Sequence, residues 1–318
     1  MTPENPDAWL VHIASGRRFA LGQGQSWAIG RGDGCPVMLD SRSVSRLHAL
    51  IQRRNAGDFQ LVDLGSRNGS FVNGRRVSIP VVLGDADRLM VGDQELLFRS
   101  IGQAAAARPD TEFDSRNAPT TALHTNKLIT ILVVDIRNFT PMTRAIPESL
   151  LSQTLGTWFL RTGNIVQRQG SWAQKYIGDA VMAVWVHDDL SRVRAEVLAV
   201  LRAAAEIDAA TAEVSQAMSL PAPIRVGGGI NTGQAILGGA DYTAIGDAVN
   251  TAFRLEAATK TLGGGVLVGD ATFRELSLRD PSAFEGWERW ELELKGYESL
   301  STAWSISFEA LRRWVAAR

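Results

Sequence analysis

The chain has 318 residues, 45% hydrophobic and 21% charged, with a formal net charge of −1. This length allows two ordinary domains, and the near-neutral charge gives no reason to expect a nucleic acid or an anionic membrane as partner. The polar N-terminus lacks the basic-then-apolar pattern of a signal peptide, and no run reaches the roughly 18–20 apolar residues of a spanning helix. One cysteine, Cys35, excludes an intrachain disulfide or a cysteine-built zinc site. We therefore expect a cytoplasmic protein.

Residues 1–101 predict an all-β sandwich, because short alternating segments are separated by Gly, Asn and Asp turn signals. The clearest strand segments are 59–64, 70–79 and 87–99, and Asn73-Gly74 is a strong hairpin signal. Residues 102–126 have no apolar periodicity and mix Ala, Pro, Thr and charge, which predicts a flexible linker.

Residues 127–318 predict an α+β domain, in which strands alternate with helices. An apolar run from Leu128 predicts a buried strand, followed by a helix within 147–169 and a strand pair over 171–185. A long helix over 188–217 comes next, then two strands over 224–231 and 234–239. A further helix is expected to begin near Asp247, and a strand, a short helix, two strands and a terminal helix complete the domain.

Asp135 ends the apolar run "LITILVV" and allows two interpretations. It is a strand-end carboxylate satisfied by backbone N–H groups or an arginine, or it is a ligand of a hard cation such as Mg²⁺. A second carboxylate, Asp179, follows Gly178 in the predicted turn of the strand pair. If the two segments are neighbours, Asp135 and Asp179 converge, and they repel each other unless a cation lies between them. The pair therefore favours a metal site.

The N-terminal sandwich carries loop motifs suited to an anion, because Arg offers a fork of charged donors and Ser a hydroxyl. These motifs are Gly30-Arg31, Ser45-Arg46-Leu47-His48, Ser66-Arg67-Asn68-Gly69 and Asn73-Gly74. In this order and spacing they resemble the forkhead-associated (FHA) family over about residues 10–99, which binds phosphothreonine peptides.

The resemblance implies a role for each matched residue. Arg31, Ser45 and Arg67 would contact the phosphate, and Asn68 the peptide backbone, while Gly30 and His48 would support the loops. Ser70 stands where the family often has Thr, which leaves the phosphate contacts in place. A sandwich that mediates interactions without phosphate is the alternative.

The second half resembles the catalytic domain of class III adenylate and guanylate cyclases, over about residues 126–310. The matching motifs are VVDIRNFT, KYIGDAVMAVW, RVGGGINTG, YTAIGDAVNTAFRLE and LKG. The resemblance implies a ferredoxin-like α+β fold and two divalent cations, Mg²⁺ or Mn²⁺, held by Asp135, Asp179 and the carbonyl of Ile136. It also implies cyclisation of a nucleoside triphosphate, with attack of the ribose 3′-hydroxyl on the α-phosphorus and loss of pyrophosphate. Two residues depart from the family, Asn138 where Gly is frequent and Phe253 where a small residue is usual.

The nucleotide-binding residues follow from the same resemblance. Lys175 and Thr243 would read the purine, Asn250 would position the ribose, Arg254 would stabilise the developing charge, and Lys295 would bind the terminal phosphates. Taken alone, Lys175 reads as a solvated lysine, and Asn250 and Arg254 as a polar helix face.

The pair of Lys175 and Thr243 resembles a bacterial subgroup that is associated with bicarbonate stimulation. A lysine can donate to adenine N1 and a threonine hydroxyl can accept from the 6-amino group, so ATP is favoured over GTP as the substrate. In this family each active site takes residues from two catalytic domains. We therefore expect a homodimer with two sites.

The sequence leaves three candidate functions for the protein. The first is an adenylate cyclase regulated through a phosphothreonine-binding FHA domain. The second is a phosphopeptide-dependent scaffold with an inactive cyclase-like dimerisation domain, and the third is a guanylate cyclase. The FHA partner would be another phosphorylated protein or the chain's own linker, in which Thr111, Thr120 and Thr121 are candidate phosphorylation sites.

Overall fold

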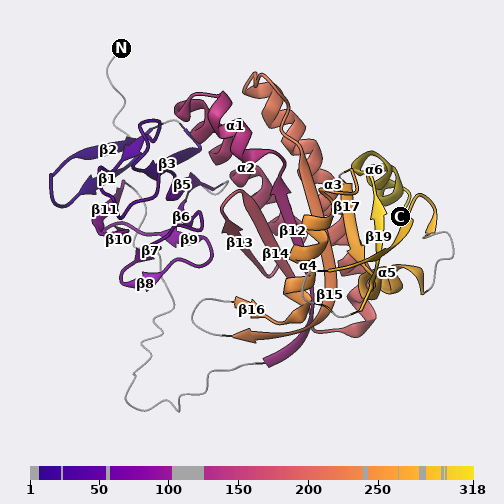
Figure 1. Ribbon diagram of the computed structural model, residues 1–318. Coiled ribbons are helices and arrows are strands. Elements are labelled where there is room, and N and C mark those ends of the chain that lie inside the picture. Colours follow the sequence, from indigo (N-terminus) through magenta and orange to yellow (C-terminus); the bar gives the residue numbers. More distant parts are fainter. Residues whose placement is uncertain are drawn as a thin grey trace, which may run out of the picture. The chain divides into compact units, whose positions relative to one another are not determined.

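The computed structural model in Figure 1 describes residues 7–22, 24–54, 58–101, 125–238, 243–263, 265–278, 284–294, 297 and 299–318. These residues form two compact units. The first contains the described residues up to 101 together with Thr143–Thr157, and the second contains the remainder. Lys295 and nearly all of the expected linker lie outside the described residues. No helix of the described part is both long and apolar enough to cross a membrane.

Within the first unit, the described residues up to 101 form an all-β sandwich, as predicted. One sheet has six strands in the order β2-β1-β11-β10-β7-β8, and the other has five in the order β4-β3-β5-β6-β9. The strands are β1 (Ala8–His12), β2 (Arg18–Leu21), β3 (Ser26–Gly30), β4 (Val37–Met38), β5 (Ala49–Arg53), β6 (Phe59–Asp63), β7 (Ser70–Val72), β8 (Arg75–Arg76), β9 (Val81–Leu83), β10 (Arg88–Val91) and β11 (Gln94–Ser100). The apolar side chains of both sheets share one core, in which Phe59 and Phe98 are almost fully buried. Alternation along each strand places the intervening polar residues outside that core.

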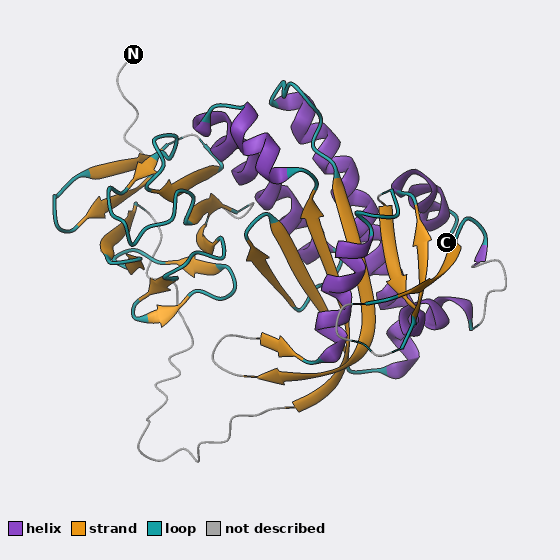
Figure 2. Cartoon of the chain, in the orientation of Figure 1, coloured by secondary structure: helices purple, strands orange, loops and turns teal. Residues whose placement is uncertain are grey.

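The second unit is built on one mixed sheet of eight strands with helices (Figure 2). Seven of the strands follow the order β13-β14-β12-β15-β17-β19-β18, and β16 pairs with β15. The strands are β12 (Thr125–Ile136), β13 (Ala173–Ile177), β14 (Ala180–His187), β15 (Val226–Gly238), β16 (Thr243–Ile245), β17 (Gly265–Gly269), β18 (Glu288–Leu292) and β19 (Ser301–Ile306). The helices assigned to the chain are α1 (Phe139–Ala145), α2 (Glu148–Arg168), the 3₁₀ turn η1 (Leu190–Arg192), α3 (Val193–Ala217), α4 (Asp247–Ala258), α5 (Asp270–Ser277) and α6 (Phe308–Ala316). The predicted α+β architecture is confirmed.

Strand β12 lies inside the sheet and is covered on both faces. Ile129, Ile131 and Val133 form a buried cluster with the apolar side of α4. Thr130 faces the other way, and its hydroxyl lies 2.7 Å from Nε2 of the buried His187. The His187 ring in turn hydrogen-bonds Glu196 of α3 through Nδ1. Because successive side chains of a strand point to opposite faces, α4 and α3 cover opposite faces, and Asp135 continues the α4-facing series.

One predicted element was wrong. The two short strands expected over 224–231 and 234–239 are not separate in the described residues, because β15 runs without interruption from Val226 to Gly238 and pairs with β12 from Thr125 to Ile136. The residues at the predicted break between the two strands, Asn231 to Gly233, pack against α4 instead. Asn231 Nδ2 donates to the carbonyl of Ala248 at 3.2 Å, and a Cβ on Gly233 would lie 2.9 Å from Ala248 Cβ. These small or polar residues allow α4 to lie close against the middle of the strand.

Candidate functional site

Asp135 and Asp179 lie beside each other because β12 pairs with β14. Asp135 stands opposite Ala180 in this antiparallel pair, and the N–H of Ile136 donates to the backbone carbonyl of Asp179 at 3.4 Å. Partial burial and, second to it, the negative charge of Asp135 together raise the pKa of the Asp179 carboxyl to about 6. The apolar strand that ends at Asp135 therefore neighbours the hairpin that carries Asp179, as the convergence of the two carboxylates requires.

The two carboxylates offer oxygen atoms of the kind that a hard divalent cation prefers. In the described part of the chain, no group of three or more His, Cys, Asp or Glu side chains is arranged to hold a metal ion. Mg²⁺ is commonly bound by one or two carboxylates that leave room for water and substrate phosphates. Burial raises the pKa of Asp179 most and the charge of Asp135 raises it next, and a cation between the two carboxylates would offset both effects. The donor set therefore fits Mg²⁺ or Mn²⁺ bound together with an anionic substrate.

Basic side chains that the sequence did not single out surround this pair. Lys260 Nζ lies 3.0 Å from Asp135 Oδ2 and 4.0 Å from the nearly buried Glu256, and Arg137 forms a 2.8 Å ion pair with Glu256. The guanidinium of Arg137 also donates to the hydroxyl of Thr259. The contacts of Lys260 with Asp135 and of Arg137 with Glu256 each join residues more than 100 positions apart, so local sequence spacing could not predict them. Glu256 and Lys260 are only four positions apart, the spacing of neighbours on a helical surface.

The position of Arg137 depends on glycine in the neighbouring strand. Gly227 of β15 pairs with Asp135, and a Cβ there would lie only 1.4 Å from an Arg137 guanidinium nitrogen. The arginine side chain therefore occupies the space that any other residue at 227 would fill. Asn138 follows with a φ of 54°, a conformation that Gly and Asn tolerate best, which accounts for an Asn where the family often has Gly.

The remaining predicted residues that the structure describes belong to other elements than the carboxylate pair. Asn250 and Arg254 are both on α4, and Asn250 is exposed. Lys175 pairs with Met182 across β13 and β14. Within the described residues, none of these three forms a hydrogen bond or ion pair with Asp135 or Asp179. Thr243 belongs to β16, and its side chain is outside the description.

The other departure from the family, Phe253, packs against the cluster of β12, β14 and α4 residues. It is half-buried there, and its neighbour Arg254 remains partly exposed. The larger side chain is thus accommodated as part of the apolar layer beneath α4.

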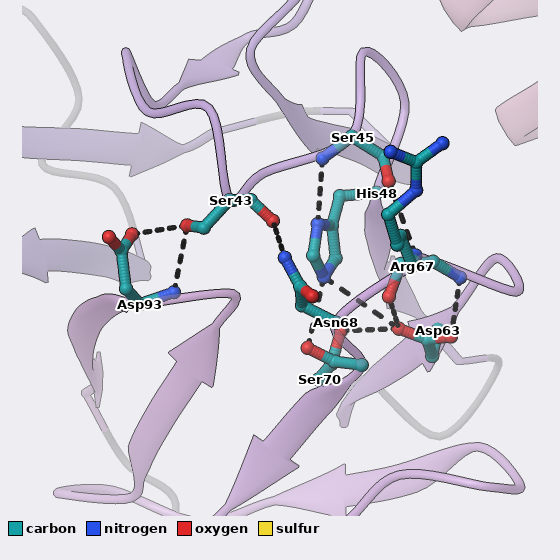
Figure 3. Close-up of polar contacts among 10 residues, drawn as sticks. Ser43, Ser45, His48, Asp63, Arg67, Asn68, Ser70 and Asp93 are labelled. Atoms are coloured by element: carbon teal, nitrogen blue, oxygen red, sulfur yellow. Dashed lines mark hydrogen bonds and ion pairs between the residues drawn. The ribbon is translucent and has the colours of Figure 1, made fainter.

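The loop residues of the sandwich converge around a buried histidine (Figure 3). His48 Nδ1 accepts the backbone N–H of Ser45 at 3.0 Å, so its Nε2 carries the proton and donates to the carbonyl of Gly69 at 3.1 Å. Burial lowers the pKa of His48 below its ordinary value, which favours the neutral ring. One side chain thus ties the loop that carries Ser45 to the loop that carries Arg67 and Asn68.

Further hydrogen bonds fix the same two loops. The Ser45 hydroxyl accepts the Arg67 N–H at 3.4 Å, and Asn68 Nδ2 donates to the Ser43 carbonyl at 2.7 Å. Asp63 accepts the hydroxyl protons of both Ser66 and Ser70, at 2.6 Å and 2.7 Å. Figure 3 shows Ser45, Arg67 and Asn68 gathered at this junction. Ser70 thus keeps a hydroxyl that bonds Asp63.

Arg31 approaches the same junction through a close backbone contact. Its N–H donates to the Ser45 carbonyl at 3.0 Å. The preceding residue, Gly30, passes so near the next carbonyl that a Cβ on it would lie 2.1 Å from the Arg46 oxygen. Only glycine allows this approach, and it places Arg31 next to Ser45. The structure therefore brings Arg31, Ser45, Arg67 and Asn68 to one edge of the sandwich, where their positive charge and hydrogen-bond donors suit a phosphate.

Comparison with known families identifies both units. The chain belongs to the adenylate and guanylate cyclase catalytic domain family, which matches residues 122–307. It also contains an FHA domain, matched over residues 27–92. Both family resemblances drawn from the sequence motifs are confirmed.

Individual relatives cover parts of the chain. An adenylate cyclase of Anabaena cylindrica is 31% identical over 155 residues, which are 47% of this chain and 31% of that protein. An oxoglutarate dehydrogenase inhibitor of Corynebacterium jeikeium is 39% identical over 84 residues, 26% of this chain and 56% of that protein. The crystal structure of the guanylyl cyclase Cya2 is similar in fold, with a TM-score of 0.50 and 22% identity over 57% of this chain and 93% of that one. The chain thus spans about a third to just over half of the two curated relatives.

Proposed function

We propose that the protein is an adenylate cyclase that converts ATP to 3′,5′-cyclic AMP and pyrophosphate, and that its FHA domain binds phosphothreonine and regulates it. The proposed organisation is an FHA domain over residues 1–101, a linker over 102–126 and a cyclase domain over 127–318. The observation that supports the enzymatic part is the position of Asp135 beside Asp179, where burial and the charge of Asp135 raise the pKa of Asp179. Membership of the cyclase family supports the reaction class.

In this proposal Asp135, Asp179 and the Ile136 carbonyl hold two Mg²⁺ or Mn²⁺ ions. When bound, such ions favour ionisation of the ribose 3′-hydroxyl and neutralise charge on the departing pyrophosphate. The chain's own contribution is positioning. β12 fixes Asp135 at the end of a buried strand, and its pairing with β14 fixes Asp179 beside it.

The remaining groups act on the nucleotide. Asn250 orients the ribose, Arg254 stabilises the negative charge that develops at the α-phosphate, and Lys295 binds the terminal phosphates. In the reaction, a bond forms between the ribose 3′-oxygen and the α-phosphorus. The bond between the α-phosphorus and the oxygen that bridges it to the β-phosphorus breaks, and the proton of the 3′-hydroxyl is released. Lys175 and Thr243 read adenine through a donor to N1 and an acceptor for the 6-amino group.

We also propose that each active site forms between two subunits of a homodimer. Asp135 and Asp179 come from one subunit, and Lys175, Thr243, Asn250 and Arg254 from the other. The absence of hydrogen bonds between the two groups within the described residues of one chain is compatible with this division. Each homodimer would then hold two sites.

The deciding experiment is to incubate purified protein with Mn²⁺ or Mg²⁺ and either ATP or GTP, and to measure cyclic product. We expect cyclic AMP from ATP, and none when Asp135→Ala replaces the parent. Cyclic GMP as the main product would favour a guanylate cyclase. No product from either nucleotide would favour the scaffold with an inactive catalytic domain.

The FHA proposal has a separate test. We expect a phosphothreonine peptide to bind the full chain, the unphosphorylated peptide not to bind, and Arg31→Ala or Ser45→Ala to abolish binding. The regulatory ligand is another phosphorylated protein or the chain's own linker, phosphorylated at Thr111, Thr120 or Thr121. If Thr111→Ala leaves the response to phosphorylation and the oligomeric state unchanged, Thr111 is not that site.

A further inference from the structure

Tyr297 contacts three residues along one side of α4. Its hydroxyl donates to the Asp247 carboxylate and lies 2.8 Å from the Thr251 hydroxyl. Its ring lies under the Arg254 guanidinium, whose central carbon is 4.5 Å from the ring centroid. The three positions follow one another by four and three residues, so they share one face of the helix. Tyr297 therefore spans the face that ends at Arg254.

Tyr297 is itself held in place. Its N–H donates to the carbonyl of Leu294 at 3.0 Å. Its side chain packs on a small core that includes Leu255 of α4, Leu267 of β17 and Ala303 of β19. A half-buried ring fixed on two strands and a helix gives a rigid platform, which is the requirement for a side chain that orients another.

The kind of contact made with Arg254 is informative. Among the residues described, no carboxylate forms an ion pair with Arg254, although ion pairs are frequent elsewhere in this unit. An aromatic face holds a guanidinium by cation–π attraction without neutralising it and without using its N–H donors. A carboxylate partner would neutralise the guanidinium and occupy its N–H donors, and it would therefore compete with a phosphate. The Tyr297 ring therefore fixes the orientation of Arg254 and leaves its charge and donors available.

We propose that Tyr297 is the positioning residue for Arg254 in cyclisation. This inference rests on the proposed function, because it takes Arg254 as the group that stabilises the developing charge. The hydrogen bonds of the hydroxyl with Asp247 and Thr251 fix the position of the Tyr297 ring along the axis of α4. The ring in turn fixes the orientation of the Arg254 guanidinium.

Two substitutions distinguish the contribution of the Tyr297 ring from that of its hydroxyl. Tyr297→Phe keeps the platform and loses both hydroxyl bonds, so we expect kcat within about threefold of the parent. Tyr297→Leu removes the platform, and kcat should fall about tenfold, the size of a partly desolvated cation–π contact. KM for ATP should stay within about twofold, because an interaction that acts only in the transition state is lost from kcat. An unchanged kcat in Tyr297→Leu would overturn the proposal, as would equal losses in the Phe and Leu variants.

A double variant tests whether the effect passes through Arg254. Adding Tyr297→Leu to Arg254→Ala should cause little further loss of kcat, because the residue to be positioned is already absent. A further loss of about tenfold in the double variant would show that Tyr297 acts independently of Arg254, and the proposal would be wrong.

Subunit complementation excludes a general folding defect. Tyr297→Leu co-expressed with Asp135→Ala should recover about a quarter of the parent activity, since half of the dimers are mixed and each has one intact site. Tyr297→Leu co-expressed with Arg254→Ala should recover none, because both lesions fall in the same half-site. Recovery with both partners, or with neither, would overturn the assignment of Tyr297 to the Arg254 half. An inactive parent would instead count against the proposed function, so the two failures are distinguishable.

Discussion

Lys260 Nζ lies 3.0 Å from Asp135 Oδ2, so a carboxylate proposed as a metal ligand is paired with an amine of the same chain. The Lys260 side chain is 51% exposed and follows directly after α4, whereas Asp135 is 15% exposed. The amine is therefore the more exposed partner of this ion pair. A divalent cation that binds Asp135 meets this positive charge as a competitor.

Replacement of Lys260 should therefore strengthen metal binding. We expect Lys260→Met to lower the dissociation constant for Mn²⁺, measured without nucleotide by paramagnetic resonance of free Mn²⁺, by about two- to fivefold. This range corresponds to the modest strength of a half-exposed ion pair. Lys127→Met is the matched control, because Lys127 forms a similar 2.7 Å pair with Asp188. Weaker Mn²⁺ binding in Lys260→Met would contradict competition.

Replacement of Asp179 should raise the stability of the metal-free protein and lower its cyclase activity. Burial and the charge of Asp135 raise its pKa to about 6, so the ionised carboxyl is unfavourable in the folded protein without metal. Asp179→Asn should raise the melting temperature of the metal-free protein and remove the further rise caused by Mn²⁺. Cyclase activity should fall roughly a hundredfold or more. A melting temperature that drops, or still rises with Mn²⁺ as in the parent, would argue against Asp179 as a ligand.

The FHA domain should lose stability in mild acid because of His48. Its pKa is lowered in the folded state from the ordinary 6.5 by burial, so the unfolded chain binds the proton first as the pH falls. Stability should therefore decrease as the pH falls below about 6.5, until the lower folded pKa is reached.

This dependence can be measured by calorimetry of the full chain, on the transition that a phosphothreonine peptide shifts. His48→Gln should be less stable overall and should have a shallower slope between pH 7.5 and about 5.5. His12→Gln is the control, because His12 is on the sandwich surface near Ser15 and Gln94 and should keep the parent slope. An unchanged slope in His48→Gln would assign the acid sensitivity to other groups.

Gly30 should be intolerant of any side chain. A Cβ there would meet the Arg46 backbone oxygen at 2.1 Å and the Cys35 sulfur at 2.9 Å, and backbone atoms cannot rotate away. Gly30→Ala should cost about 1–3 kcal/mol of unfolding free energy in urea and abolish phosphopeptide binding, because Arg31 moves from Ser45. Gly22→Ala has nothing within 4 Å of the added carbon and should be nearly neutral. Full peptide binding by Gly30→Ala would show that the close approach is not needed.

Much of the candidate site could be predicted from sequence because its parts are local. The apolar strand before Asp135, the hairpin turn at Asp179 and the start of a helix at Asp247 each depend on periodicity or turn chemistry within about ten residues. The loop motifs of the sandwich were identifiable for the same reason, since Arg31, Ser45 and Arg67 lie in short segments between strands.

The tertiary structure decided what those segments meet. The predicted break between two strands near Asn231 to Gly233 was wrong, because the pairing of β15 with β12 from Val226 to Leu237 and the close approach of α4 fit an extended chain. The contacts of Lys260 with Asp135 and of Tyr297 with Arg254 join residues 125 and 43 positions apart. Such pairs are set by the crossing of strands and helices in the sheet, and no local spacing records them. The sequence alone thus specified the chemical groups, and only the folded chain determined which charges and rings lie next to them.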